Sequence, residues 1–108
     1  MNKGMLDPQV LNEIIRRIVE VAEPEKIILF GSAARGEMNR HSDVDLLIIK
    51  ECASPLDLMG DIYMNLDGAG AAVDAVVVTP QAVERYKDSH ALVIKPALRE
   101  GRVVYEGT

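Results

Sequence analysis

The sequence predicts an α/β (α+β) fold in which helices flank a small mixed β-sheet of about four strands. Two observations lead to this prediction. Apolar residues between positions 8 and 22 recur at the three- and four-residue spacing of an amphipathic helix. Short runs rich in Val, Ile and Leu, at 27–30, 44–49 and 73–78, have the length and composition of buried strands. Because the 108 residues contain no repeat or linker, we expect a single domain, 1–108.

The first half of the chain is expected to hold one helix and two strands. Asp7 can cap the helix N-terminus, and Pro8 suits its first turn because no intrahelical acceptor is needed there. The apolar run at 27–30 follows as the first strand. Residues 31–42 are predicted as a polar loop, with small residues at its start that favour a helix beginning. The second strand is 44–49.

The second half repeats the helix-start signal twice. Ser54-Pro55 opens a helix, and Thr79-Pro80 opens helical material that runs towards residue 100 and that Pro96 either kinks or restarts. The predicted inner face of the first of these helices consists of Leu56, Met59, Ile62, Tyr63 and Leu66. With strands at 73–78 and 103–105, the expected order is α-β-β-α-β-α-α-β.

The composition is that of a globular protein and argues against several partner classes. Acidic residues outnumber basic ones by 17 to 12, and the formal charge of −5 repels the phosphate backbone of nucleic acids. Cys52 is the only cysteine, so neither an intramolecular disulfide nor a cysteine-based zinc cluster can form. No apolar run approaches the roughly 18 residues of a membrane helix, and the first residues lack a secretory leader pattern. We expect a cytoplasmic protein without a membrane or nucleic-acid partner.

Gly31-Ser32 directly follows a predicted buried strand and precedes two alanines. A helix that begins at this point presents backbone N–H groups without intrahelical acceptors, together with the positive end of its dipole. Gly31 lets a phosphate approach the backbone without a Cβ in the way, and Ser32 adds a hydroxyl donor. The pair therefore predicts a nucleotide-binding position.

Three carboxylates are placed where they could bind metal ions. Asp43 and Asp45 stand two residues apart at the start of a strand, and the strand period of two puts both on one face. Such a pair repels itself unless a cation lies between the carboxylates, and Mg²⁺ prefers oxygen ligands. Asp74 is the single charge in 73–78, and pairing of that strand with 44–49 would bring it to the same metals. Three carboxylates on neighbouring strands match a two-metal centre for phosphoryl transfer.

These residues also have simpler interpretations. The aspartate pair could belong to a solvated junction, and Asp74 could face water from an edge strand. Arg35 could meet a phosphate oxygen, because it lies one helical turn after the glycine-serine pair, or it could form a surface ion pair with Glu37. His41 lies in the same loop and could contact a substrate. The residues alone leave these alternatives open.

The spacing of the two motifs resembles that of a known family. Ten residues separate Gly31-Ser32 from Asp43-Val44-Asp45, which gives the Gly-Ser-x10-Asp-x-Asp signature of the polymerase β-like nucleotidyltransferase superfamily. The stretch FGSAARGEMNRHSDVDLLI and the ending ALREGRVVYEG look like its minimal nucleotidyltransferase (MNT) branch. The resemblance implies the nucleotidyltransferase fold.

The resemblance also implies a role for each motif residue. Gly31 and Ser32 would hold the β- and γ-phosphates of ATP. Asp43 and Asp45 would ligate two Mg²⁺ ions. Asp74 would ligate the catalytic ion and help to deprotonate an attacking hydroxyl, which displaces diphosphate from the α-phosphorus.

A partner is implied as well, because minimal nucleotidyltransferases of this kind resemble the antitoxin partners of HEPN-domain toxins, which are helical ribonucleases. The reaction implied there is transfer of AMP onto a toxin tyrosine. A second hypothesis is a non-catalytic nucleotide-binding module that neutralises the toxin by occlusion. A third is transfer to a small molecule such as an aminoglycoside, against which the short chain argues. The three intact carboxylates favour the first hypothesis.

Overall fold

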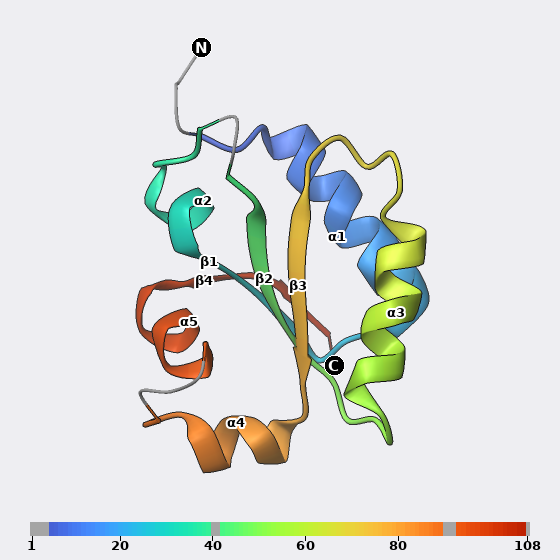
Figure 1. Cartoon of the computed structure of the whole chain (residues 1–108), viewed down its shortest axis with the longest axis vertical. Helices are drawn as coiled ribbons and strands as arrows, with labels where there is room; N and C mark the ends of the chain where they lie inside the picture. Colours follow the sequence, from blue (N-terminus) through green and yellow to red (C-terminus); the bar gives the residue numbers. More distant parts are fainter. Residues whose placement is uncertain (1–4, 40–41, 90–92, 108) are drawn as a thin grey trace.

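The computed structural model describes residues 5–39, 42–89 and 93–107, and its helices and strands alternate around one sheet (Figure 1). In chain order the elements are α1 (Pro8–Ala22), β1 (Lys26–Phe30), α2 (Gly31–Arg35), β2 (Val44–Ile49), α3 (Pro55–Asn65), β3 (Val73–Val78), α4 (Pro80–Tyr86), α5 (Ile94–Glu100) and β4 (Arg102–Glu106). The strands at 27–30, 44–49 and 73–78 are thus confirmed, as are the helices that begin at Pro8, Pro55 and Pro80.

The four strands form one mixed sheet in the order β3-β2-β1-β4, which confirms the predicted sheet. Strand β1 runs antiparallel to both β2 and β4, whereas β2 and β3 are parallel. A parallel pair requires a crossover connection, and here α3 supplies it. In this strand order β3 is an edge strand, and within the described part of the chain it pairs with β2 alone.

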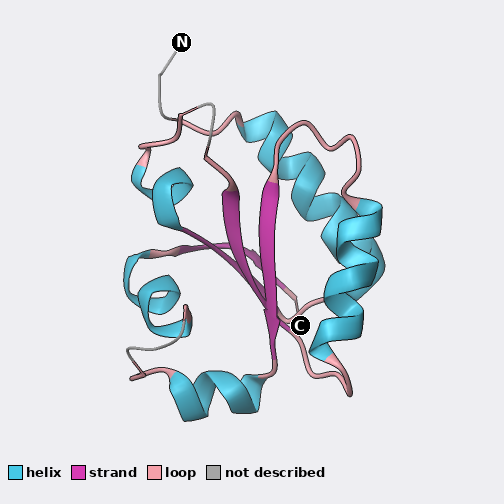
Figure 2. Ribbon diagram, in the orientation of Figure 1, coloured by secondary structure: helices cyan, strands magenta, loops and turns pink. Residues whose placement is uncertain are grey.

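Helices cover both faces of the sheet, with α1 and α3 on one side and α5 on the other (Figure 2). The alternation of side chains along each strand sends residues to one face or the other. The core on the α1 and α3 side includes Ile14, Ile18, Ile27, Leu29, Leu46, Ile48 and Ile62. The core on the α5 side consists of Ile28, Leu47, Ile49, Ile94 and Ala97. Strand β2 contributes to both cores, and this explains its continuous apolar sequence.

Helix capping follows the predicted pattern. The Asp7 side chain accepts a hydrogen bond from the Gln9 amide at 2.9 Å, Ser54 accepts one from Asp57 at 3.2 Å, and Thr79 accepts one from Ala82 at 3.1 Å. Each of these bonds satisfies one N–H group that has no intrahelical acceptor. The three sequence signals therefore mark true helix starts.

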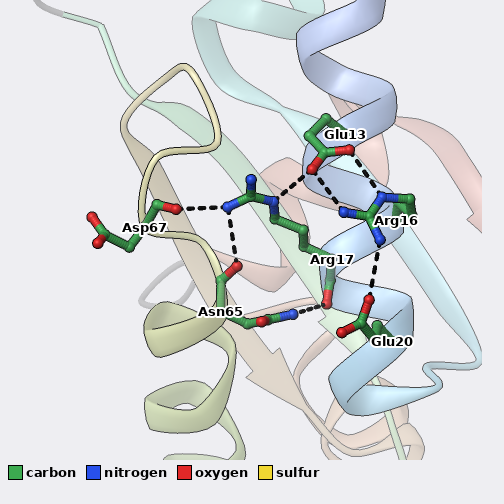
Figure 3. Close-up of polar contacts among 6 residues, drawn as sticks. All are labelled: Glu13, Arg16, Arg17, Glu20, Asn65 and Asp67. Atoms are coloured by element: carbon green, nitrogen blue, oxygen red, sulfur yellow. Dashed lines mark hydrogen bonds and ion pairs between the residues drawn. The ribbon is translucent and has the colours of Figure 1, made fainter.

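Arg17 joins α1 to the C-terminal end of α3 (Figure 3). Its guanidinium donates to the carbonyl oxygens of Asn65, at 3.4 Å, and Asp67, at 2.6 Å, while Glu13 accepts from it at 2.7 Å. The Asn65 side-chain amide donates back to the Arg17 carbonyl at 2.9 Å. A cation at this end satisfies carbonyl groups that the last helical turn leaves unpaired. The network therefore fixes the end of α3 against α1.

The structure corrects two expectations and decides between two alternatives at Pro96. Residues 31–35 form the short helix α2, so the polar loop is shorter than predicted. The two helices expected after Thr79 are confirmed as α4 and α5, and Pro96 lies in the first turn of α5, so it restarts the helix instead of kinking it. On α3, Leu56 is 77% exposed and Tyr63 is 41% exposed, so neither belongs to the inner face. Within the described ranges, no helix is long and apolar enough to span a membrane.

Candidate nucleotide and metal site

Gly31 stands where β1 ends and α2 begins, and its conformation depends on a carboxylate of the next strand. Phe30 pairs with Asp45 in the β1–β2 ladder, so Gly31 lies beside the Asp45 side chain. The φ angle of Gly31 is 71°, in the left-handed region that other residues rarely adopt. A Cβ at this position would collide with Oδ2 of Asp45. Backbone geometry and space therefore both require glycine here.

The short helix α2 follows and turns the chain back towards β2. Gly36 ends it with φ of 69°, and the Ser32 carbonyl accepts a hydrogen bond from the Glu37 amide at 2.9 Å. Because α2 has only five residues, its dipole is small. The N–H groups of its first turn nevertheless have no acceptor within the helix. Ser32 is half-buried in that turn, where the sequence predicts phosphate contacts.

Asp45 and Asp74 are directly opposite one another in the parallel β2–β3 ladder. The Val44 amide donates to the Ala72 carbonyl at 2.8 Å, so the ladder is already formed at this end. By alternation Asp45 shares a face with Leu47 and Ile49, and Asp74 shares that same face with Val76 and Val78. The expected pairing of these two strands is confirmed, and it brings the two carboxylates together on the side of the sheet that α5 covers.

The pKa of Asp45 responds to burial and to the charges of the other two carboxylates. Burial raises the pKa of the Asp45 carboxyl, the charges of Asp74 and Asp43 raise it further, and Arg35 acts in the opposite direction. Asp45 is half-buried, whereas Asp43, just before β2, and Asp74 are exposed. Hard oxygen donors with uncompensated negative charge are the chemistry that a divalent cation selects. These side chains therefore fit Mg²⁺ as a donor set.

The carboxylates are close enough to interact, but they do not converge on one point. Among the residues that the structure describes, no three His, Cys, Asp or Glu side chains are gathered as ligands of a metal ion. The ladder places Asp45 opposite Asp74, and a metal site at these carboxylates stays a prediction.

Arg35 forms an ion pair with Glu37, with 2.6 Å between Nε and Oε1, and its Nη1 lies 3.8 Å from Glu100 of α5. Of the two predicted roles of Arg35, the structure therefore shows the surface ion pair with Glu37. Arg35 nonetheless opposes the rise in the pKa of Asp45, so its charge reaches that carboxyl group. A nucleotide-binding role of Arg35 stays a prediction.

Asp74 fits both positions that the sequence allowed for it, an edge strand facing water and a place beside the other carboxylates. It lies on an edge strand and is exposed, and it also stands opposite Asp45. The sequence missed Tyr63 of α3, whose hydroxyl lies 3.5 Å from Oδ1 of Asp74. Its position in the helical repeat indicated a core residue, and no signal in the pattern distinguishes a core tyrosine from one at a sheet edge. His41 lies outside the described residues.

A hollow of about 580 Å³ lies along α4 and is lined by Thr79, Gln81, Ala82, Glu84, Arg85 and Tyr86. Helix α4 follows the C-terminal end of β3, whereas Asp74 is at its N-terminal end. The hollow is therefore at the opposite end of the strand from the carboxylates, and it belongs to a different part of the surface.

Comparisons with known proteins identify the family and the fold. A family model described as a nucleotidyltransferase domain matches residues 10–104. A curated protein of Methanocaldococcus jannaschii, named "Putative protein adenylyltransferase", is 32% identical over 83 residues, which cover 75% of this chain and 78% of that protein. The crystal structure of a "putative nucleotidyltransferase" from Sulfolobus solfataricus superposes with a TM-score of 0.53 at 20% identity, over 94% of this chain and 90% of the other. At that identity the last comparison speaks for the fold alone.

The family match spans α1 to β4 and so includes every element that carries a candidate site residue. On these grounds the chain belongs to the nucleotidyltransferase domain family, as one of its minimal members.

Proposed function

We propose that the chain transfers AMP from ATP to a hydroxyl group of a partner protein, with two Mg²⁺ ions held by Asp43, Asp45 and Asp74. The observation that carries the proposal is the pairing of Asp45 with Asp74 on parallel strands, with Gly31 fitted against Asp45. Nucleotidyl transfer follows from the family. The metal ions, the nucleotide and the acceptor are the proposed part.

The chain's own residues have distinct tasks in this reaction. Gly31 and Ser32 offer backbone N–H groups and a hydroxyl to the β- and γ-phosphates. Bound Mg²⁺ would neutralise the triphosphate and stabilise the charge that develops during transfer. Asp74 accepts the proton of the acceptor hydroxyl. The hydroxyl oxygen bonds to the α-phosphorus, the bond from that phosphorus to the oxygen bridging to the β-phosphate breaks, and diphosphate leaves.

A protein acceptor is favoured over a nucleic acid by the charge of the chain. Its formal charge of −5 opposes a phosphate backbone, and only 4% of its residues are aromatic, so surfaces that stack bases are scarce. The name of the Methanocaldococcus relative points in the same direction. The resemblance to MNT antitoxins specifies the acceptor further as a tyrosine of a HEPN-domain toxin.

The proposal is tested by incubating the chain with a co-expressed HEPN-domain protein, Mg²⁺ and ATP labelled at either the α- or the γ-phosphate. We expect label on the partner from α-labelled ATP only, with a mass increase of one or more AMP groups. Label from γ-labelled ATP would indicate phosphorylation and contradict the proposal. Absence of label from both would contradict any transfer to this partner.

A double variant in the candidate site and a control variant outside it separate catalysis from occlusion. Asp43→Asn combined with Asp45→Asn removes two candidate ligands, whereas Asp61→Asn removes one charge from the exposed side of α3. We expect labelling to disappear with the first variant and to persist with the second. If the Asp43→Asn, Asp45→Asn variant still silences the toxin in cells, the non-catalytic binding module is the better description.

A further inference from the structure

The outer edge of β3 is held by a side chain instead of another strand. An edge strand presents backbone N–H and C=O groups that have no partner in the sheet. At Ala75 these groups point away from β2 and meet the hydroxyl of Tyr63. The Ala75 amide donates to that hydroxyl at 2.7 Å, and the Ala75 carbonyl lies 3.3 Å from it. One hydroxyl thus replaces two bonds of an absent neighbouring strand.

The same hydroxyl lies 3.5 Å from Oδ1 of Asp74, the residue before Ala75. A hydroxyl has one proton, so it can donate either to the Ala75 carbonyl or to the Asp74 carboxylate while it accepts from the Ala75 amide. Tyr63 itself belongs to α3, which Arg17 fixes against α1. The carboxylate that faces Asp45 is therefore connected to the rigid helical layer through one side chain.

We propose that Tyr63 is a positioning residue for Asp74: its hydroxyl fixes the edge of β3 and limits the orientations of the Asp74 carboxylate opposite Asp45. The inference rests on the proposed function, because it concerns the same metal site. Groups that orient metal ligands typically change metal affinity or activity on the order of 10-fold or more when they are removed. A loss of that size is expected here from the loss of a single oxygen atom.

The test uses Tyr63→Phe, which retains the ring and removes only the hydroxyl. Tyr86→Phe on α4 is the matched control, since Tyr86 is 38% exposed compared with 41% for Tyr63 and lies at the other end of β3. Mn²⁺ affinity is measured by calorimetric titration of the full chain. We expect Tyr63→Phe to weaken Mn²⁺ binding about 10-fold and Tyr86→Phe to leave it unchanged.

Two further measurements distinguish positioning from general stability. In an Asp74→Asn background, Tyr63→Phe should no longer affect Mn²⁺ affinity, because the group on which it acts is absent. In the transfer reaction, Tyr63→Phe should lower kcat and leave KM for ATP within about twofold of the wild type, because Gly31 and Ser32 are intact. An equal loss of affinity with and without Asp74 would overturn the inference.

Hydrogen exchange supplies a test that requires no variant. The Ala75 amide of the wild-type chain should exchange slowly for a residue at an open sheet edge, and exchange at the rate of an unprotected amide would overturn the inference. A wild-type chain that binds no Mn²⁺ and transfers no nucleotide would contradict the proposed function itself. An active wild type that is matched by Tyr63→Phe in both affinity and kcat would contradict the inference alone.

Discussion

Gly31 and Asp45 occupy adjacent positions at the end of the β1–β2 ladder, and the Asp45 side chain leaves no room for a side chain at position 31. The glycine leaves the volume that the carboxylate Oδ2 fills, and its left-handed backbone turns the chain into α2. The same arrangement leaves Asp45 half-buried beside two other negative charges, and its pKa is raised as a result. A partly buried carboxyl whose pKa is raised by burial and by neighbouring negative charges is a candidate functional group.

Gly31→Ala should impair folding and activity together. An alanine at this φ angle is strained by about 1–2 kcal/mol, and its Cβ would displace the Asp45 carboxylate. We expect a drop of at least that size in the free energy of unfolding, measured with urea, and loss of nucleotide transfer.

Gly60→Ala is the matched control for that substitution. Gly60 lies inside α3, and a Cβ there would meet no atom within 4 Å. Because alanine is the better helix former by about 0.5–1 kcal/mol, this variant should be more stable than the wild type. A Gly31→Ala variant that is as stable as Gly60→Ala would show that the geometry at Gly31 is unimportant.

Asp45→Asn should abolish transfer without lowering the melting temperature. The substitution removes a half-buried negative charge that Asp43 and Asp74 repel, so the metal-free chain at neutral pH is expected to melt at the same or a higher temperature. Thermal unfolding monitored by circular dichroism, in the presence of a chelator, checks this. A clear decrease would instead identify Asp45 as a structural residue.

At the scale of helices and strands, most of the fold could be predicted because the local signals and the tertiary structure agree. The cap-and-proline pairs at Asp7, Ser54 and Thr79 all begin helices, and the three β-branched runs are all strands. The sequence predicts that Asp74 lies near Asp45 only if their two strands pair. The order of elements favours that pairing, and the observed β2–β3 ladder establishes it.

The predictions from sequence were wrong or incomplete mainly where tertiary contacts determine the exposure or the partner of a side chain. Leu56 and Tyr63 follow the helical repeat of α3, but the sheet ends at β3, so part of the helix face extends beyond the core. The helix start expected at Gly31-Ser32 is present, but the helix extends to Arg35, and Gly36 ends it in the left-handed conformation. Arg35 has two anionic partners within reach, Glu37 and Glu100, and sequence spacing identifies only the first.

The contact between α1 and α3 has a pH dependence that can be measured. Hydrogen bonds from Arg16 and Arg17 lower the pKa of Glu13 from 4.5 to about 2. A carboxyl with a lowered folded-state pKa stabilises the fold above pH 4.5, and this contribution is lost as the pH falls towards 2. Glu13→Gln should therefore lower the melting temperature slightly at pH 7 and have no effect near pH 2.

Salt and a neighbouring substitution provide the controls for Glu13. Because the pairs are at the surface, about 1 M salt should reduce the difference between Glu13→Gln and the wild type. Glu20→Gln, which loses only one contact with Arg16, should have a smaller effect. A pH-independent difference would show that Glu13 acts through packing and not through charge.

At the scale of the whole molecule, the candidate site lies at one end of the sheet, where β1 ends and where β2 and β3 begin. Its residues lie on or next to these strands, and Asp43 and Asp74 are exposed. A ligand that bound there only in the folded chain would add its binding free energy to the stability of the fold.

Mg²⁺ together with ATP should raise the melting temperature of the wild-type chain. A ligand that binds only the folded state stabilises it by about 2.7 kcal/mol at 100 times its dissociation constant. Differential scanning fluorimetry with Mg²⁺, ATP or both checks this, and we expect the largest increase with both. The Asp43→Asn, Asp45→Asn variant should show no increase, and an equal increase in that variant would place the nucleotide elsewhere.

The parallel pairing of β2 with β3 also affects the order in which the residues of the candidate site come together during folding. Strands β1 and β2 are joined by residues 31–43 and can meet early, whereas β3 can reach β2 only after 50–72 have formed the crossover. Contacts distant in sequence form more slowly because closing a longer loop loses more chain entropy. A refolding chain therefore acquires Gly31, Asp43 and Asp45 in place before Asp74, and enzymatic competence should lag behind the recovery of secondary structure.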